Sequence, residues 1–566
     1  MDVDHHRLDL VRQRSTELEN HVIDEFLAGR LTRRDFLRRG TIVGLSLPVL
    51  GAVLAACGSS SSSTPGASTS TGAARGKAGA TIKVGILVPT GAIDPITIAD
   101  QGGQDMIAQT GEYLCLADQQ LALRPVLATG WKPNADASAW AFTIRQGVKF
   151  SNGSPLTVDD VVYTFKTQCD PKNATNALSA FGGVLLPDGV VKTSETTVTF
   201  NLVSPNGNFP YLCSTDNYNM VIAPNNYNFK NWQSSFIGTG PFIKESYTPN
   251  VGAAFMRNPG YWGRKALPAR TEFTFYPEEA PMTAALQAGA IDVEGQFSVA
   301  TSPQLLTGGF NIISLKTSTH RELSMRTDLH PFTSKDVRQA IAYTLDRPAI
   351  LAALFKGYAE IGNDSPFAPV FRSTDTSVPQ RAKNLTLAKQ LLAKAGVPHG
   401  FSTPLLTETT QEMPHFAEVI KQSAAAIGVD ISLTIETPTK YYGSAVFGKS
   451  DWLDGEMSLV DYGARSVPNV LLAAPLQTIN SKAGSGSWNA ARFNNPTYDT
   501  LSKQYIAALD LSSQRRIAGQ IQRLLLDETP VIYAYFYDFL TATAKNITGV
   551  YPTGIGHLFL YNAGTT

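Results

Sequence analysis

Alternating apolar and polar positions predict the first ordered strand at residues 81–88. The apolar positions that share one face are Ile82, Val84, Ile86 and Val88. Leu87 adds an apolar residue on the opposite face, which predicts burial on both sides, and Pro89-Thr90-Gly91 ends the strand. A strand that leads into a Gly/Pro loop is typical of the sheet edge at which α/β proteins form ligand crevices.

The region that follows is richer in strands. Two of its alternating patterns are Trp140, Phe142 and Ile144, and Val198, Phe200 and Leu202. Between them, Thr157-Val158-Asp159-Asp160 fits a capping-box helix start, and apolar residues then recur at helical spacing up to Phe165.

From about residue 320, helical and strand patterns alternate, which indicates a βα lobe. Helices are predicted near residues 334–345, 387–395, 416–427, 498–509 and 514–527, and a strand over residues 429–435. Pro530 breaks the last helix, and residues 531–537 predict a buried strand. Strand periodicity places Tyr533, Tyr535 and Tyr537 of this strand on one face.

Composition narrows the class of protein. The chain has 566 residues, 43% of them hydrophobic and 17% charged, which predicts a globular protein of two or three lobes. Lys+Arg and Asp+Glu both number 47, and this balance argues against a nucleic-acid partner. The cysteines Cys57, Cys115, Cys169 and Cys213 lack metal-ligand spacing, so neither a zinc site nor a disulfide framework can be read from them.

The N-terminus predicts export. Arg33 and Arg34 precede an apolar run over residues 41–56, which is shorter than the roughly 20 residues of a membrane-spanning helix. The arginine pair resembles the twin-arginine signal, and Leu54-Ala55-Ala56-Cys57 resembles the lipobox of bacterial lipoproteins. We expect residues 1–56 to be the signal, Cys57 to carry a lipid, and residues 57–79 to be a flexible Ser/Gly tether. The alternative is a short membrane-anchoring helix.

A family resemblance rests on several segments in order. The most specific begins at Trp140 and reads W-A-F-T-I-R-Q-G-V-K-F-S-N-G-S-P-L-T-V-D-D-V. It is followed by GTGPF at residues 238–242, RNPGYW at 257–262, LQAGAID at 286–292 and DVRQAIAY at 336–343. Together these resemble the family 5 extracellular solute-binding proteins, the oligopeptide, dipeptide and nickel binders of ABC importers. The signature residues themselves form turns and a helix cap, so we interpret them as scaffold.

The resemblance implies an α/β, type II periplasmic-binding-protein fold. Two α/β lobes enclose a ligand cleft, and a mixed, strand-rich lobe is inserted in the first. On this basis lobe I comprises residues 80–113, 233–320 and 530–566, lobe II residues 114–232, and lobe III residues 321–529. The ligand is expected between lobes I and III.

The resemblance also points to Asp461, because an aspartate of lobe III in a similar segment meets the amino terminus of the peptide in peptide-binding members. Such a carboxylate–ammonium contact is a strong, charge-assisted hydrogen bond. A surface or helix-capping aspartate is the alternative. After Tyr462 the sequence departs from the family's usual Asp-Pro and continues with residues 463–469, which puts the substrate class in question.

Other candidate ligand contacts each have a structural alternative. The guanidinium of Arg465 could donate two hydrogen bonds to an anionic group of the ligand; the alternative is an ion pair between lobes. Tyr441, Trp452 and Tyr462 offer aromatic surface, or else core packing. The loop that begins at Thr90 offers backbone donors, or else a turn. His320 lies at the crossing between lobes, where it contacts ligand or serves as a hydrogen-bonded hinge.

Function classes can be separated by motif. The chain has no GxSxG, HExxH, GxxxxGK[ST] or strand-linked GxGxxG motif, so we expect no enzyme and no cofactor. The five histidines after Cys57 have no paired spacing, so the sequence gives no support for a metal site. We expect a monomeric binding protein, lipid-anchored outside the cytoplasmic membrane, that delivers a small solute to permease subunits. The alternative is a lipid-anchored sensor or adhesion protein that reuses the fold.

Overall fold

A computed structural model describes residues 76–480 and 485–566. The predicted export signal at residues 1–56, with Arg33 and Arg34, lies outside the described residues, as do Cys57 and the predicted tether up to residue 75. Two of the last four residues of the predicted tether are bonded to the folded part of the chain. Lys77 donates its backbone N–H to Thr565, and Gly79 donates to Leu267.

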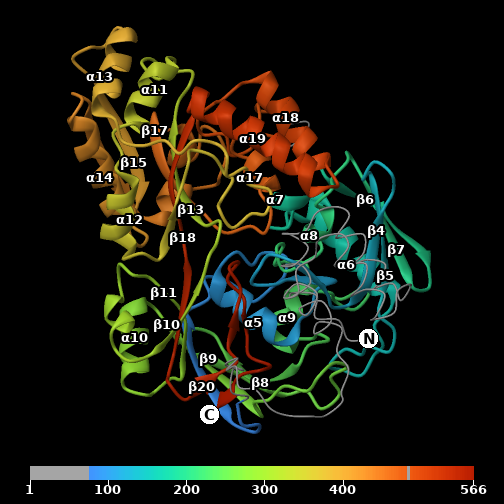
Figure 1. Cartoon of the computed structure of the whole chain (residues 1–566). Coiled ribbons are helices and arrows are strands. Elements are labelled where there is room, and N and C mark those ends of the chain that lie inside the picture. The colour runs from blue at the N-terminus through green and yellow to red at the C-terminus, as the bar shows by residue number, and fades with distance from the viewer. Residues whose placement is uncertain (1–75, 481–484) are drawn as a thin grey trace, which may run out of the picture. The chain divides into compact units, whose positions relative to one another are not determined.

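The first of three larger sheets in this part of the chain has seven strands (Figure 1). In spatial order these are β12 (Asn311–Leu315), β19 (Phe539–Thr543), β11 (Val293–Phe297), β1 (Thr81–Leu87), β10 (Arg270–Tyr276), β9 (Gly252–Arg257) and β8 (Phe242–Thr248). Strand β1 is parallel to both β10 and β11, and the outer pairs are antiparallel. Helices α5 (Gln101–Thr110) and α10 (Glu279–Gln287) pack against this sheet.

The predicted first strand is confirmed, but one detail of its burial is wrong. Ile82, Val84 and Ile86 are buried in the core that α5 shares, whereas Leu87 is 44% exposed. On the other face Gly85 lies against Met282 of α10 and Ile291, so the face is covered at Gly85 and open at Leu87.

The second sheet has six strands and joins the first through two chain crossings. Its strands are β14 (Ala359–Ile361), β18 (Val531–Tyr537), β13 (His320–Met325), β17 (Met457–Tyr462), β15 (Ser402–Glu408) and β16 (Asp430–Glu436). The chain passes between the sheets from β12 to β13 and from β18 to β19. Beside it lie α11 (Lys335–Ala342), α12 (Arg347–Phe355), α13 (Leu385–Lys394) and α14 (Met413–Ala425) (Figure 1).

A register shift in β18 corrects the predicted face of its tyrosines. Between His320 and Glu322 of β13 the pairing with β18 slips by one residue. Tyr533 therefore packs in one cluster with Phe536, while Tyr535 packs in another with Ile532. A bulge reverses the faces on either side of it, so the three tyrosines do not share one face.

The strand-rich region forms a four-stranded antiparallel sheet, which confirms the strands predicted there. Its strands are β4 (Ala128–Pro133), β5 (Ala139–Ile144), β7 (Thr197–Leu202) and β6 (Leu185–Ser194). Helix α6 (Val158–Cys169) covers it. The backbone N–H of Thr157 donates to the carboxylate of Asp160 as the capping box predicts, and the Thr157 hydroxyl donates to the same carboxylate. Its short helical segments are η1 (Pro171–Asn173), α7 (Leu178–Phe181), α8 (Phe209–Leu212), η2 (Phe229–Asn231) and α9 (Trp232–Ser235).

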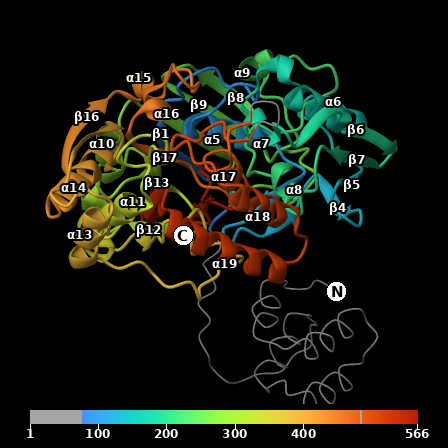
Figure 2. The same ribbon diagram turned by 90° about the horizontal axis from the view of Figure 1, so that it is seen from above.

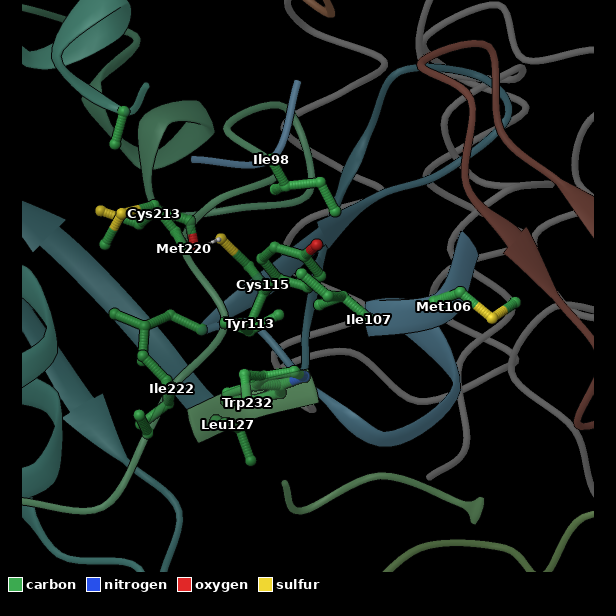
Figure 3. Packing of buried hydrophobic residues seen from close by; sticks show 14 of the residues in the cluster. Ile98, Met106, Ile107, Tyr113, Cys115, Leu127, Cys213, Met220, Ile222 and Trp232 are labelled. Atoms are coloured by element: carbon green, nitrogen blue, oxygen red, sulfur yellow. Dashed lines mark hydrogen bonds between the residues drawn. The ribbon is translucent and has the colours of Figure 1, made fainter. Parts of the chain in front are cut away.

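The cysteines of the described residues are free thiols inside the protein. Figure 3 shows Cys115 and Cys213 in the core formed with Tyr113, Leu127 and Trp232. The thiol of Cys115 donates to the carbonyl of Pro210 at 3.3 Å. Burial raises the pKa of both thiols, so they are unreactive packing groups here.

The last helices bring the strand-rich region against the six-stranded part. These helices are α15 (Pro438–Tyr442), α16 (Asp451–Asp454), α17 (Asn469–Ala473), α18 (Pro496–Ala507) and α19 (Leu511–Glu528). Gly207, just before α8, donates its N–H to the carbonyl of Ile506 in α18 at 2.8 Å; Figure 2 shows both helices on the same side of the molecule. Asn208 bonds both Asn469 and Gln514 across the same contact.

The remaining elements are short. One more helical segment is η3 (Pro303–Leu306), and the small two-stranded pairs are β2 (Cys115–Ala117) with β3 (Leu123–Pro125), β20 (Ile547–Thr548) with β23 (Gly564–Thr565), and β21 (Tyr551–Pro552) with β22 (Leu558–Phe559). No helix among the described residues is both long and apolar enough to cross a membrane. The three-lobe division remains a prediction. Residues 531–537, which the prediction assigns to lobe I, form β18 and pair within the six-stranded sheet, so the chain leaves that sheet only after Tyr537.

Candidate ligand-binding site

Asp461 lies in the middle of a buried polar cluster. It is on β17, directly opposite Arg321 of the antiparallel strand β13. Arg321 is 0% exposed, whereas the side chain of Asp461 retains 33% of its surface. The guanidinium of Arg321 donates to one carboxylate oxygen of Asp461, and the Tyr537 hydroxyl donates to the same oxygen at 3.3 Å.

The guanidinium of Arg321 uses all five of its N–H groups. Nε and Nη2 donate to the two carboxylate oxygens of Glu412 at 2.7 and 3.1 Å. Nη2 also donates to Gln411 at 2.9 Å, and Nη1 donates to the Tyr537 hydroxyl at 2.8 Å and to Asp461. This bidentate, fully bonded arrangement holds Arg321 and its carboxylates in one geometry.

Burial and neighbouring charges have opposing effects on the pKa values of this cluster. Burial raises the pKa of Asp461; the charge of Arg321 opposes that rise, and the nearby Glu412 adds to it. Burial also raises the pKa of Glu408, at the end of β15, with a further contribution from Asp461. The pKa of Arg321 lies above its ordinary value because the two carboxylates outweigh its loss of solvation. The cluster is thus a buried cation facing several carboxylates.

A small cavity adjoins this cluster. One wall is residues 296–300, at the end of β11 and just after it. The other wall includes Tyr358, Gln411, Glu412 and Tyr537. The cavity thus lies between the seven-stranded and six-stranded parts.

The predicted aromatic contacts belong mainly to the packing behind Asp461. Tyr441, Trp452 and Tyr462 are buried members of one apolar cluster. The Tyr441 hydroxyl donates to the carbonyl of Leu459 at 2.9 Å, so its polar group is already bonded within the protein. Tyr442, also in the contact shell of this cluster, accepts the backbone N–H of Asp461 at 3.2 Å. These contacts favour core packing for Tyr441 and Trp452.

His320 is completely buried beside the crossing between the sheets. Its Nδ1 lies 2.8 Å from the carbonyl of Ser318, and its ring packs against Tyr462, Tyr533 and Phe536. Burial lowers the pKa of His320 to about 3. A neutral, enclosed ring with this hydrogen bond favours the hinge interpretation.

Arg465 and Thr90 lie outside the Arg321 cluster. The backbone of Arg465 makes two hydrogen bonds with the hydroxyl of Ser318, both at 2.8 Å. Burial raises the pKa of Asp216 to about 6, and the charge of Arg465 partly opposes that rise. Ser466 donates its N–H to Asp216 at 2.6 Å. The segment after Tyr462 therefore bonds both to Ser318, beside the crossing between the sheets, and to Asp216 of the strand-rich region. This connection favours an interlobe role for Arg465. Thr90 is exposed and donates to Asp100 at 3.0 Å.

Sequence reasoning missed Arg321, Glu412 and Tyr537. The available signal was two adjacent charged residues, Arg321 and Glu322, at the start of a short strand that proves to be buried at every position. Buried charges require partners, but the pattern does not identify which residues those are. Among the described residues, no group of three or more His, Cys, Asp or Glu side chains is arranged to hold a metal ion.

Comparison with known proteins identifies the class. The family model for bacterial extracellular solute-binding proteins, family 5 Middle, matches residues 122–476. Heme-binding protein A of Haemophilus influenzae is 25% identical over 446 residues, which cover 72% of this chain and 78% of that protein. The dipeptide-binding protein DppE of Bacillus subtilis is 23% identical over 471 residues, 77% of this chain and 83% of that one.

A solved structure agrees on the fold. The ABC transporter-associated periplasmic binding protein DppA from Helicobacter pylori, in complex with peptide STSA, superposes with a TM-score of 0.71 at 19% identity, covering 86% of this chain and 98% of that chain. The molecule therefore has the mixed α/β fold of type II periplasmic binding proteins. The chain belongs to the family 5 bacterial extracellular solute-binding proteins.

Proposed function

We propose that this chain is the solute-binding component of an ABC importer and captures a peptide or similar small amine between lobes I and III. The observation that carries the proposal is the placement of Asp461. Its carboxylate is partly exposed and held by Arg321 beside the cavity between the two sheets. Family membership and the importer named in the matching structure support the same function.

Asp461 would meet the ammonium group of the solute. One carboxylate oxygen is bonded to Arg321 and Tyr537, and about a third of the side-chain surface of Asp461 is exposed. A charge-assisted hydrogen bond in such a partly desolvated site is stronger than the same bond in water. The bond requires both charges.

Binding would close the two lobes around the solute. The chain crosses between the sheets from β12 to β13 and from β18 to β19, so these crossings are the natural hinge. A ligand that contacts both walls of the cavity binds the closed arrangement better and shifts the population towards it. The closed form is then the one presented to the permease subunits.

The export and anchoring assignments are part of the same proposal. The twin-arginine pair Arg33-Arg34 and the lipobox before Cys57 support export and lipid attachment at the outer face of the cytoplasmic membrane. A Cys57→Ala variant would be recovered in the soluble extracytoplasmic fraction, whereas the unaltered chain would sediment with membranes. Equal membrane recovery of both would contradict lipid anchoring at Cys57.

The binding function is tested by recovering the natural ligand. The mature chain is purified without denaturation, and compounds released on unfolding are identified by mass spectrometry. Recovery of a peptide or other amine, with a ligand-dependent rise in melting temperature, is expected. Asp461→Ala should lose that compound, while Glu418→Ala, on the exposed face of α14, should retain it. No released compound and no thermal shift with peptides, sugars or metal chelates would overturn the proposal in favour of a sensor or adhesion role.

A further inference from the structure

Two cations near the crevice, Arg321 and Lys316, are already paired with carboxylates of the protein. Arg321 donates all five N–H groups to protein acceptors, so it has none left for an anionic group of a ligand. The ammonium of Lys316 lies 3.2 Å from a carboxylate oxygen of Asp538. Arg465 lies outside this cluster, and its guanidinium donates to the carbonyl of Ala464 at 2.9 Å. A solute carboxylate would have to break one of these pairs to bind Arg321 or Lys316.

Carboxylates, by contrast, outnumber cations in the cluster around Asp461. Glu408 and Glu412 are almost completely buried, and together with the partly exposed Asp461 they set three carboxylates against the one guanidinium of Arg321. Glu408 interacts electrostatically with both Asp461 and Arg321, so we count it with this cluster. The chain as a whole has equal numbers of acidic and basic residues, so this excess is local.

Burial makes that excess effective. In a partly desolvated cleft, charges of one sign act at longer range and are less screened than on the surface. An incoming cation relieves the repulsion among the three carboxylates, whereas an incoming anion adds to it. The second wall, residues 296–300, contributes no cation, because its sequence is Gln-Phe-Ser-Val-Ala.

We infer that the solute is net cationic: it carries an ammonium or guanidinium group in excess of any carboxylate. This inference rests on the proposed binding function and specifies the class of solute. A basic peptide or a polyamine fits it, and a zwitterionic or acidic peptide of the same size fits less well. Discrimination comes from the protein's lack of an unpaired cation beside Asp461 as much as from its excess of carboxylates.

The test compares probes that differ in charge but little in shape. Calorimetric affinities are measured for trialanine, its C-terminal amide and its N-acetyl form, and for trilysine and triglutamate. The amide should bind at least tenfold more tightly than the free acid, the N-acetyl form should not bind, and trilysine should bind most tightly. The affinity for trilysine should fall steeply with added salt.

A variant pair locates the effect. Glu408→Gln keeps the shape of a buried side chain and should reduce the preference for trilysine over trialanine amide several-fold. Glu418→Gln removes the same charge from the exposed face of α14 and should leave the preference unchanged.

The outcomes separate the two claims. If trialanine or triglutamate binds as tightly as trilysine, in an Asp461-dependent manner, the charge inference is wrong and the binding function stands. If no probe binds and no solute is recovered from the purified protein, the binding function itself fails.

Discussion

Arg321 and Asp461 lie directly across from each other on β13 and β17, 140 residues apart in the chain, and the guanidinium of one donates to the carboxylate of the other. The same guanidinium is bidentate to Glu412. One arginine therefore both compensates buried charge and sets the position of the proposed ligand contact.

Replacing Arg321 should destabilise the protein strongly. Arg321→Leu leaves the carboxylates of Glu412 and Asp461 without their cation, and breaking a buried ion pair in this way typically costs about 3–5 kcal/mol. Urea unfolding monitored by circular dichroism should show the loss. The control is Arg264→Leu, at an exposed position, which should change stability by less than about 0.5 kcal/mol. Equal stability of the two variants would mean that the cluster is solvated and worth little.

Binding of an amine should release protons and strengthen as the pH rises. Burial raises the pKa values of Asp461 and Glu408 in the free protein, and a bound ammonium lowers them again. Affinity is therefore greatest above the raised pKa values and falls as the pH drops through them. Titration calorimetry at pH 5, 6 and 7 in buffers of different ionisation enthalpy measures the released protons. Asp461→Asn should reduce the release; a pH-independent affinity in the unaltered protein would contradict this account.

Two buried histidines should make the folded state sensitive to acid. Burial lowers the pKa of both His320 and His557 to about 3, compared with an ordinary value of 6.5. Between these values the unfolded chain binds protons that the folded chain does not, so stability falls as the pH drops from about 6.5 towards 3. Each histidine contributes a slope of up to about 1.4 kcal/mol per pH unit in this range.

The histidine slope can be measured by removing one ring at a time. Urea unfolding of the unaltered chain and of His320→Gln is compared at pH 4, 5, 6 and 7. The variant is expected to start less stable at pH 7, because its side chain packs less well against Tyr533 and Phe536, but to lose less stability on acidification. A slope identical to that of the unaltered chain would show that His320 does not titrate differently in the two states.

The contact between Gly207 and α18 should control closure of the strand-rich region against the six-stranded part. A Cβ at Gly207 would lie 2.1 Å from the carbonyl oxygen of Ala508, so any side chain must push the two apart. Gly207→Val should therefore weaken ligand binding by making the closed arrangement less favourable. Gly130→Val is the control, because a Cβ there meets no atom within 4 Å. Binding that is unaffected by Gly207→Val would show that closure does not depend on this contact.

Much of the secondary structure could be predicted from the sequence because its causes are local. Thr157 and Asp160 are three residues apart, so their hydrogen bonds, and the helix that begins there, follow from the capping-box pattern. The strand at residues 531–537 was found with its bounds unchanged, since a short apolar run after Pro530 admits little else. The family resemblance added the type II fold and the position of Asp461, neither of which periodicity alone supplies.

The faces and partners of those elements were decided by the tertiary structure. Tyr533 and Tyr535 separate into different cores because β18 slips by one residue against β13, and strand periodicity by itself contains no information about a bulge in the pairing. Leu87 stays exposed because α10 covers the neighbouring Gly85 and not the end of the strand.

The candidate site shows the same division. Sequence by itself determined the residue types present, an aspartate in a family-like segment and a charged pair, Arg321-Glu322, in what became β13. Only the tertiary structure decided that Arg321 pairs with Glu412 and Asp461, because those partners lie 91 and 140 residues away and meet it through strand register and the loop after β15. An unpaired buried charge is costly, so a buried arginine needs a carboxylate partner; which distant residue becomes that partner depends on how the strands and loops pack.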